Sequence, residues 1–223
     1  ACLKHDIKKI IHTSTSEVYG DSLKMPISET HLPYAKSPYA ATKIGADQIA
    51  QSYYSTFNLP VSIIRPFNTY GPRQSNRAII PTIITQLLNN KKIIKLGSLY
   101  PTRDFSYIVD TIRAFEASIN NIKSIGEIIN IGSGFEVSIK DIVSMLCKIT
   151  DKSPKIITDV NRIRPKKGEV FRLKANNSKA KKLLNWKPTY SGKTGLMKGL
   201  NETVAWFTNN ENLKKYKTDH YVR

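Results

Sequence analysis

Hydrophobic and polar positions divide the first part of the chain into two short strands separated by one long helix. Residues 8–15, KKIIHTST, form an apolar run followed by small polar residues, a pattern typical of a short buried strand. Apolar residues recur at helical spacing from Pro38 to about Phe57, with Ser37 as the N-cap and Pro38 at the first helical position. Residues 61–65, VSIIR, predict a second strand. This order predicts a βαβ unit of a parallel sheet, in which ligands bind at the carboxyl ends of the strands.

After Pro81 the pattern changes to shorter, alternating helices and strands. We expect helices at 82–90, 138–150 and 195–207, strands at 92–97 and 126–132, and a strand that runs into a helix at 104–119. The chain is therefore predicted to be an α/β protein with a smaller α/β lobe beside the first sheet. The predicted boundary between segments 1–75 and 76–223 is gradual.

Length and composition narrow the class of protein. With 223 residues, 40% of them hydrophobic, the chain can bury a sizeable core as one domain or as one domain with a small lobe. No apolar stretch approaches the roughly 20 residues that span a bilayer, and the first residues, ACLKHDIKK, lack the features of a signal peptide. We therefore predict a cytoplasmic protein without membrane contact. Cys2 and Cys147 are far apart and have no ligand-like neighbours, so neither a disulfide framework nor a metal site is predicted.

The net charge of +18, from 35 basic and 17 acidic residues, raises the question of nucleic-acid binding. Such binding needs a basic patch, but the lysines are scattered along the chain. The only dense cluster is RIRPKK at 162–167, and a short basic loop could equally hold the diphosphate of a small ligand. We therefore predict no nucleic-acid partner.

Tyr39 and Lys43 stand four residues apart on the predicted helix, so their side chains project from one face. Such a pair is common on helix surfaces by chance. Here, however, the helix follows a strand that ends in Ser14, Thr15 and Glu17. A lysine beside a tyrosine hydroxyl favours the phenolate, the form that acts as a base. The context therefore indicates a catalytic pair.

Four motifs in order resemble a known family: TSTSEVYG (13–20), SPYAATK (37–43), RPFNTYGPR (65–73) and PTRDF (101–105). Together they resemble the extended short-chain dehydrogenases/reductases of the NAD-dependent epimerase/dehydratase family. The similarity is greatest to nucleotide-sugar 4,6-dehydratases of the N-acetylglucosamine type, on the route to legionaminic acid. The resemblance implies NAD as cofactor, a nucleotide-diphosphate sugar as substrate, and a homodimer formed through the Tyr39–Phe57 helix.

The same resemblance implies a Rossmann-type parallel sheet with a smaller C-terminal α/β substrate lobe. Residues 1–75 would be the C-terminal part of the NAD-binding domain, and residues 76–223 mainly the substrate lobe. The family pattern begins with a strand and a G-x-x-G-x-x-G turn that binds the pyrophosphate of NAD, and this sequence contains no such motif. We therefore expect the N-terminal strands of the sheet to be missing, as in a fragment of the full enzyme.

The resemblance also assigns roles at the site. Tyr39 would remove the proton of the sugar C4 hydroxyl, and Lys43 would bind the nicotinamide ribose. Thr15 would hydrogen-bond the C4 oxygen, Ser14 would border the nicotinamide, and Glu17 would remove the C5 proton. Further assignments are Pro66 and Thr69 to the cofactor and Asn68, Arg77, Arg103, Arg164 and Arg172 to the nucleotide sugar.

Ser16 occupies the position where glucose-type dehydratases carry an aspartic acid that protonates the departing C6 hydroxyl. Serine is too weak an acid for that role, so Glu17 would take the C5 proton and then hand it to the leaving hydroxyl. A structural alternative for Glu17 is a carboxylate that caps a turn.

Three other functions stay open. Simple 4-epimerases usually carry a small or apolar residue at the position of Glu17. UDP-glucuronate decarboxylases usually carry YDEGK where this chain has YAATK (39–43). The third alternative is an inactive remnant that only binds nucleotide sugars.

Overall fold

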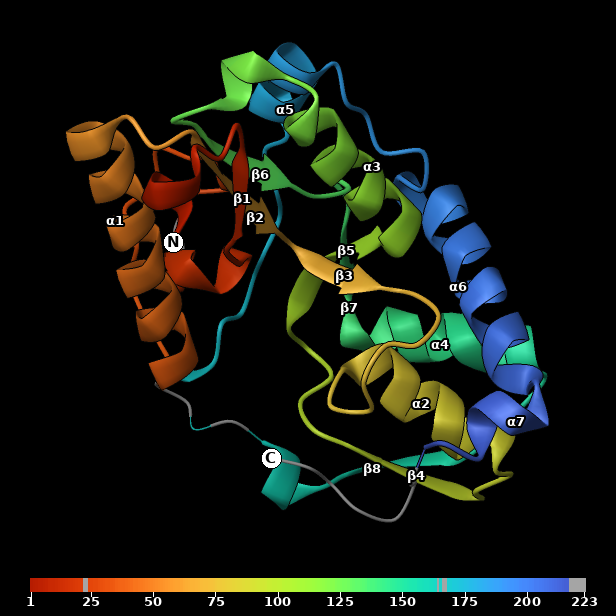
Figure 1. Ribbon diagram of the computed structural model, residues 1–223. Coiled ribbons are helices and arrows are strands. Elements are labelled where there is room, and N and C mark those ends of the chain that lie inside the picture. The colour runs from red at the N-terminus through yellow and green to blue at the C-terminus, as the bar shows by residue number, and fades with distance from the viewer. Residues whose placement is uncertain (22–23, 164, 166–167, 217–223) are drawn as a thin grey trace.

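The computed structural model of the protein describes residues 1–21, 24–163, 165 and 168–216. Its first sheet is parallel, with the strand order β1-β2-β6. These strands are β1 (Ile10–Thr13), β2 (Val61–Pro66) and β6 (Ile128–Ile131). Helix α1 (Pro38–Phe57) lies on one side of the sheet, and helices α3 (Ile108–Ile119) and α5 (Ser178–Leu184) lie on the other (Figure 1). The predicted βαβ unit, β1-α1-β2, is therefore confirmed.

Helix α1 has the bounds that its sequence signals predict. The Ser37 hydroxyl accepts a hydrogen bond from the Ala40 N–H at 3.1 Å, and Pro38 occupies the first turn, where a missing N–H costs nothing. The helix ends at Asn58, which adopts a left-handed conformation with φ 53°. Local capping chemistry therefore places Tyr39 and Lys43 in the first two turns of α1.

The second part of the molecule is built around a mixed sheet with the order β3-β5-β7. Strand β3 pairs parallel with β5, and β5 pairs antiparallel with β7. Helices α2, α4 and α6 pack with this sheet around a core that includes the fully buried Ile83, Ile142 and Leu200. The bounds are β3 (Asn68–Tyr70), β5 (Thr102–Tyr107), β7 (Glu136–Ser138), α2 (Ile79–Leu88), α4 (Ile139–Thr150) and α6 (Gly192–Thr208).

A separate parallel pair, β4 (Ile93–Leu96) and β8 (Lys155–Thr158), lies beyond α2 and α4 (Figure 1). The remaining described elements are short: η1 (Cys2–His5), η2 (Ser16–Tyr19), η3 (Ile122–Ser124), η4 (Val160–Arg162) and α7 (Asn210–Leu213). No helix in the described ranges has the length and apolarity that crossing a membrane requires.

Several elements differ from the sequence predictions. Helix α2 begins at Ile79, before Pro81, because a proline is tolerated in the first turn of a helix. The strands β3, β7 and β8 and the helix α5 were not predicted, because each is too short for a clear periodic pattern.

Strand β6 also shows that the chain returns to the first sheet after leaving it. This strand pairs with β2, although it lies within the segment 76–223, which was predicted to form mainly the second lobe. The position of the boundary near residue 75 stays a prediction.

Candidate active site

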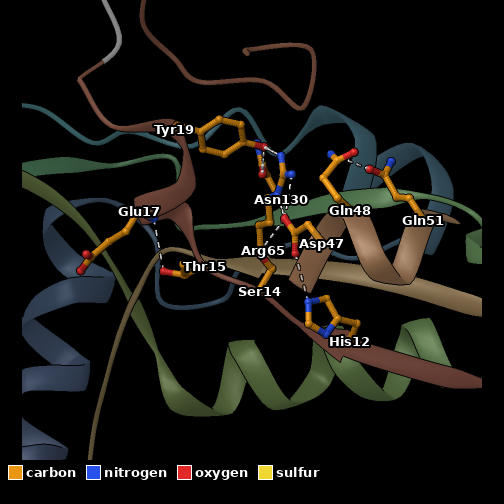
Figure 2. Close-up of polar contacts among 10 residues, drawn as sticks. All are labelled: His12, Ser14, Thr15, Glu17, Tyr19, Asp47, Gln48, Gln51, Arg65 and Asn130. Carbon is orange, nitrogen blue, oxygen red and sulfur yellow. Dashed lines mark hydrogen bonds and ion pairs between the residues drawn. The ribbon is translucent and has the colours of Figure 1, made fainter. Parts of the chain in front are cut away.

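The turn after β1 presents Glu17. Thr15 begins the η2 helix, and its Oγ1 accepts a hydrogen bond from the Glu17 N–H at 3.2 Å. Gly20 ends the helix with φ 59°, and a Cβ there would collide with the carbonyl oxygen of Tyr34. Ser16 is buried. The Glu17 side chain points away from the polar side chains at the carboxyl end of β1 (Figure 2). A short, conformationally restricted turn thus carries this carboxylate.

Helix α1 brings Lys43 to the carboxyl end of β1. Its ammonium Nζ donates to the carbonyl oxygen of Thr13 at 2.9 Å. One turn further, the Asp47 carboxylate accepts a hydrogen bond from the Ser14 hydroxyl at 2.9 Å. Tyr39, one turn before Lys43, is 50% exposed. The structure therefore places Tyr39, Lys43 and Ser14 where α1 meets the end of β1, as the sequence motifs predict for a ligand site of a parallel sheet.

A cavity of about 640 Å³ brings together five of the predicted site residues. Its lining includes Glu17, Asn68, Thr69, Arg77 and Arg103. Thr69, assigned to the cofactor by resemblance, thus lies with the residues assigned to the substrate. Buried oxygen Oδ1 of Asn68 has no hydrogen-bond partner among the described residues. An orphaned acceptor at a cavity wall is typical of a site that is completed by a ligand or by water.

The charged residues that line this cavity are of both signs. Among the described residues that line it, three are arginines, Arg77, Arg103 and Arg162, and two are glutamates, Glu17 and Glu169. Arg103 Nη2 lies 3.2 Å from Glu169 Oε1, which holds its guanidinium in place. Guanidinium groups match phosphate oxygens in geometry and charge. The arginines of this cavity are therefore the candidate contacts for a diphosphate.

The structure does not bring Arg172 into this cavity. Arg172 lines a second cavity of about 740 Å³ and donates two hydrogen bonds to Glu136, at 2.8 and 2.7 Å. These bonds hold the pKa of the Glu136 carboxyl below its ordinary value. The backbone of Arg172 forms a β-bridge with Thr102 of β5. Because neighbouring side chains of a strand point to opposite faces, Arg103 lies on the other face of β5.

Two further predicted residues have different outcomes. Pro66 is the last residue of β2 and pairs in register with Ile131 of β6, so it lies at the carboxyl edge of the first sheet. Arg164 lies outside the described residues.

A buried polar cluster was not predicted from the sequence. Asp47 and Arg65 are 1% and 2% exposed and form an ion pair at 2.8 Å (Figure 2). The signal that could have revealed it is Arg65 itself, a charge at the end of the apolar run VSIIR, where an unpaired cation would be costly. Gln74 and Glu169, which also line the first cavity, carry no comparable signal.

Comparisons with known proteins identify the family of this chain. A family model described as GDP-mannose 4,6 dehydratase matches residues 1–198. The human dTDP-D-glucose 4,6-dehydratase is 33% identical over 208 residues, which cover 92% of this chain and 57% of the human protein.

Two solved structures are similar in fold and sequence. The UDP-glucuronic acid 4-epimerase from Bacillus cereus, solved with UDP-glucuronic acid and NAD, has a TM-score of 0.84 and 36% identity, covering 96% of this chain and 64% of that protein. The dTDP-glucose 4,6-dehydratase from Bacillus anthracis, solved with NAD, has a TM-score of 0.80 and 31% identity, covering 91% and 62%. The chain thus spans about three fifths of the length of these relatives.

Proposed function

The chain belongs to the GDP-mannose 4,6-dehydratase family, and from this premise we propose that it supplies catalytic and substrate-binding residues of an NAD-dependent nucleotide-sugar 4,6-dehydratase. The observation that carries this proposal is the position of Glu17, which lines the same cavity as Asn68 and Arg103. Family membership does not choose between dehydratase and epimerase, since the relatives include both. Glu17 favours the dehydratase, because epimerisation at C4 requires no proton to leave C5.

The residues at the end of β1 fit the nicotinamide-ribose part of NAD. Lys43 brings an ammonium group to the Thr13 carbonyl, and Tyr39 presents a half-exposed phenol one turn away. When bound, NAD would take a hydride from C4 of the sugar and, after water has left, deliver it to C6, and a proton added at C5 would complete the 6-deoxy-4-keto product. Two similar structures, of the epimerase and the dehydratase named above, were solved with NAD, which supports the same cofactor here.

Each residue then has a defined proton to hold or move. Tyr39 accepts the proton of the C4 hydroxyl, and Lys43 binds the ribose. The Thr15 oxygen already accepts the Glu17 N–H, so its own hydroxyl hydrogen can be donated to the C4 oxygen. Once C4 is a ketone, the C5–H bond is acidic and Glu17 accepts that proton. The C6–O bond breaks as Glu17 returns the proton to the leaving hydroxyl, which departs as water and leaves a C5=C6 double bond.

The cavity supports a diphosphate-linked sugar as substrate, with Arg77 and Arg103 near the phosphates. For the sugar itself we propose an N-acetylglucosamine type. The support is the sequence GSLYPTRDF (97–105), INIGSGFEVSI (129–139) and RIRPKKGEV (162–170). Because NAD and nucleotide sugars are cytoplasmic metabolites, a cytoplasmic location is part of the same proposal.

The test is a pair of variants in the full-length protein loaded with NAD. Glu17→Gln keeps the shape of the side chain but cannot accept the C5 proton, so C4 oxidation should continue while water elimination stops. NADH absorbance and a 4-keto sugar should accumulate without 6-deoxy product.

Tyr39→Phe should instead lower the rate of the first step, oxidation at C4, by about 10²–10⁴-fold, because loss of a general base has that effect. The control is Glu127→Gln, which removes a carboxylate that pairs with Lys179 and does not line the cavity.

The substrates offered should be UDP-N-acetylglucosamine, dTDP-glucose and UDP-glucuronate. If Glu17→Gln released 6-deoxy-4-keto sugar at the rate of the unmodified protein, Glu17 would be structural and the proposal would lose its support. Conversion of UDP-glucuronate to its C4 epimer by the unmodified protein would establish the second candidate, a 4-epimerase. The 36% identity to the Bacillus cereus epimerase is what favours that candidate. Release of carbon dioxide would instead indicate a decarboxylase.

We also propose that the protein forms a homodimer through α1. Ile49, Tyr53 and Phe57 recur every four residues on this helix and are 62%, 41% and 55% exposed. Ile49 points away from Asp47, which faces the sheet, and Tyr53 and Phe57 continue the exposed row at four-residue spacing. A continuous apolar stripe on an exposed helix is typical of a contact surface between subunits.

A further inference from the structure

A buried ion pair joins α1 to the first sheet. Arg65 of β2 donates from Nε and Nη2 to the same carboxylate oxygen of Asp47, at 3.0 and 2.8 Å. The other Asp47 oxygen lies 3.1 Å from His12 Nε2 of β1. Both charged groups are at most 2% exposed, so the pair is shielded from solvent and its geometry is well determined by its bonds.

This ion pair reaches both ends of the turn that carries Glu17. Ser14, immediately before the turn, donates its hydroxyl to Asp47 at 2.9 Å. Tyr19, the last residue of η2, accepts a hydrogen bond from Arg65 Nη1 at 2.9 Å. Residues 15–18 lie between these two attachment points, and Figure 2 shows Thr15 and Glu17 beside them. A shift of the ion pair would therefore move the whole turn.

Tyr19 also links the ion pair to β6 through hydrogen bonds. Its hydroxyl donates to Asn130 Oδ1 at 2.7 Å, and Asn130 donates from Nδ2 to the Ile27 carbonyl at 3.1 Å. Burial raises the pKa of Tyr19 against the opposing effect of Arg65, so the phenol keeps its proton and can accept from Arg65 while it donates to Asn130. Every polar atom in this chain of contacts thus has the partner that its chemistry requires.

The same ion pair is also tied to the proposed first base. Asp47 follows Lys43 by four residues and Tyr39 by eight, so the three side chains share one stripe of α1. Lys43 and Asp47 bind consecutive residues of the β1 end, Thr13 and Ser14. The helix that carries Tyr39 and the turn that carries Glu17 therefore meet at Asp47.

We propose that Asp47, Arg65 and Tyr19 are positioning residues that set the distance between the C4 base Tyr39 and the C5 base Glu17. This inference rests on the proposed dehydratase function. Two bases acting on adjacent carbons of one sugar need a fixed separation, because a misplacement of about 1 Å can cost 10²-fold in rate. A buried ion pair is a weak source of stability, since an apolar pair of similar volume often does as well. Its hydrogen bonds to Ser14 and Tyr19, on either side of Glu17, give it a role that an apolar pair lacks.

The test compares Tyr19→Phe with Tyr70→Phe in the full-length protein. Both tyrosines are at most 2% exposed and both donate a hydroxyl hydrogen bond, Tyr19 to Asn130 and Tyr70 to the Leu196 carbonyl in the other core. In Tyr19→Phe, amide hydrogen exchange of residues 15–20 should be faster by about five- to tenfold. The kcat of dehydration should fall by about 10–100-fold, with KM within about twofold. Tyr70→Phe should change neither measurement.

A double variant, Asp47→Leu with Arg65→Met, removes the ion pair without leaving a buried charge. It should keep a cooperative unfolding transition and show the same faster exchange at residues 15–20. Equal exchange at these residues in Tyr19→Phe, Tyr70→Phe and the unmodified protein would overturn the proposal. Hydrogen exchange requires no substrate, so it decides the positioning role even if no nucleotide sugar is converted, an outcome that would count against the proposed function alone.

Discussion

At the scale of single residues, Arg172 and Arg103 show how strand pairing places side chains on opposite faces of a sheet. Its bridge to Glu136 lowers the pKa of that carboxyl, so the bridge stabilises the fold above the ordinary glutamate pKa and is lost as the pH falls through the lowered one. We expect Arg172→Gln to lower the free energy of unfolding at pH 7, and the difference from the unmodified protein to shrink at an acidic pH below the lowered pKa of Glu136. Urea denaturation at both pH values measures this.

Lys214→Gln is the matched control, because Lys214 and Glu211 form a pair that is 72% and 78% exposed. Such a pair contributes little, so its removal should leave the free energy of unfolding unchanged at both pH values. If Arg172→Gln behaved like Lys214→Gln but weakened nucleotide-sugar binding, Arg172 would be a ligand contact, as its sequence motif predicts.

At the scale of elements, helix α1 depends on its cap. The Ser37 hydroxyl satisfies the Ala40 N–H in the first turn of this helix. Ser37→Ala should therefore lower the free energy of unfolding by about 1 kcal/mol, within a range of 0.5–2. Ser37→Asp should retain most of the stability, because a carboxylate caps as well and favours the helix N-terminus. Urea unfolding of the three proteins tests this, and equal loss in both variants would show that the cap contributes nothing.

At the scale of the whole molecule, the exposed stripe of α1 predicts self-association. Phe57→Lys places a charge in the stripe and should convert a dimer into a monomer at micromolar protein concentration, because a buried unpaired charge is costly. Sedimentation velocity measures the mass. Ile122→Lys, on the η3 turn and 79% exposed in the unmodified chain, is the control and should leave the mass unchanged. A monomer before any substitution would contradict the proposed dimer.

Local patterns determined a large part of this protein. Capping at Ser37 and Asn58 depends on residues within one turn, so the bounds of α1 follow directly from the chain. The alternation of apolar runs and helical periods likewise predicts parallel pairing of β1 with β2. Motif order brought Glu17, Asn68 and Arg103 together as candidates, and the three line one cavity. Their catalytic roles stay predictions.

Only the tertiary structure decided the features that depend on distant partners. Strand β6 joins the first sheet from a segment more than sixty residues beyond β2, and no local signal marks that return. Arg172 faces away from Arg103 because strand pairing, not motif order, sets the side of the sheet. Tyr19 and Asn130, 111 residues apart, complete the polar cluster around Asp47. A charged residue in an apolar run indicates that the fold must supply a partner for it. Only the folded chain shows which residue that partner is, because residues distant in sequence meet only in the fold.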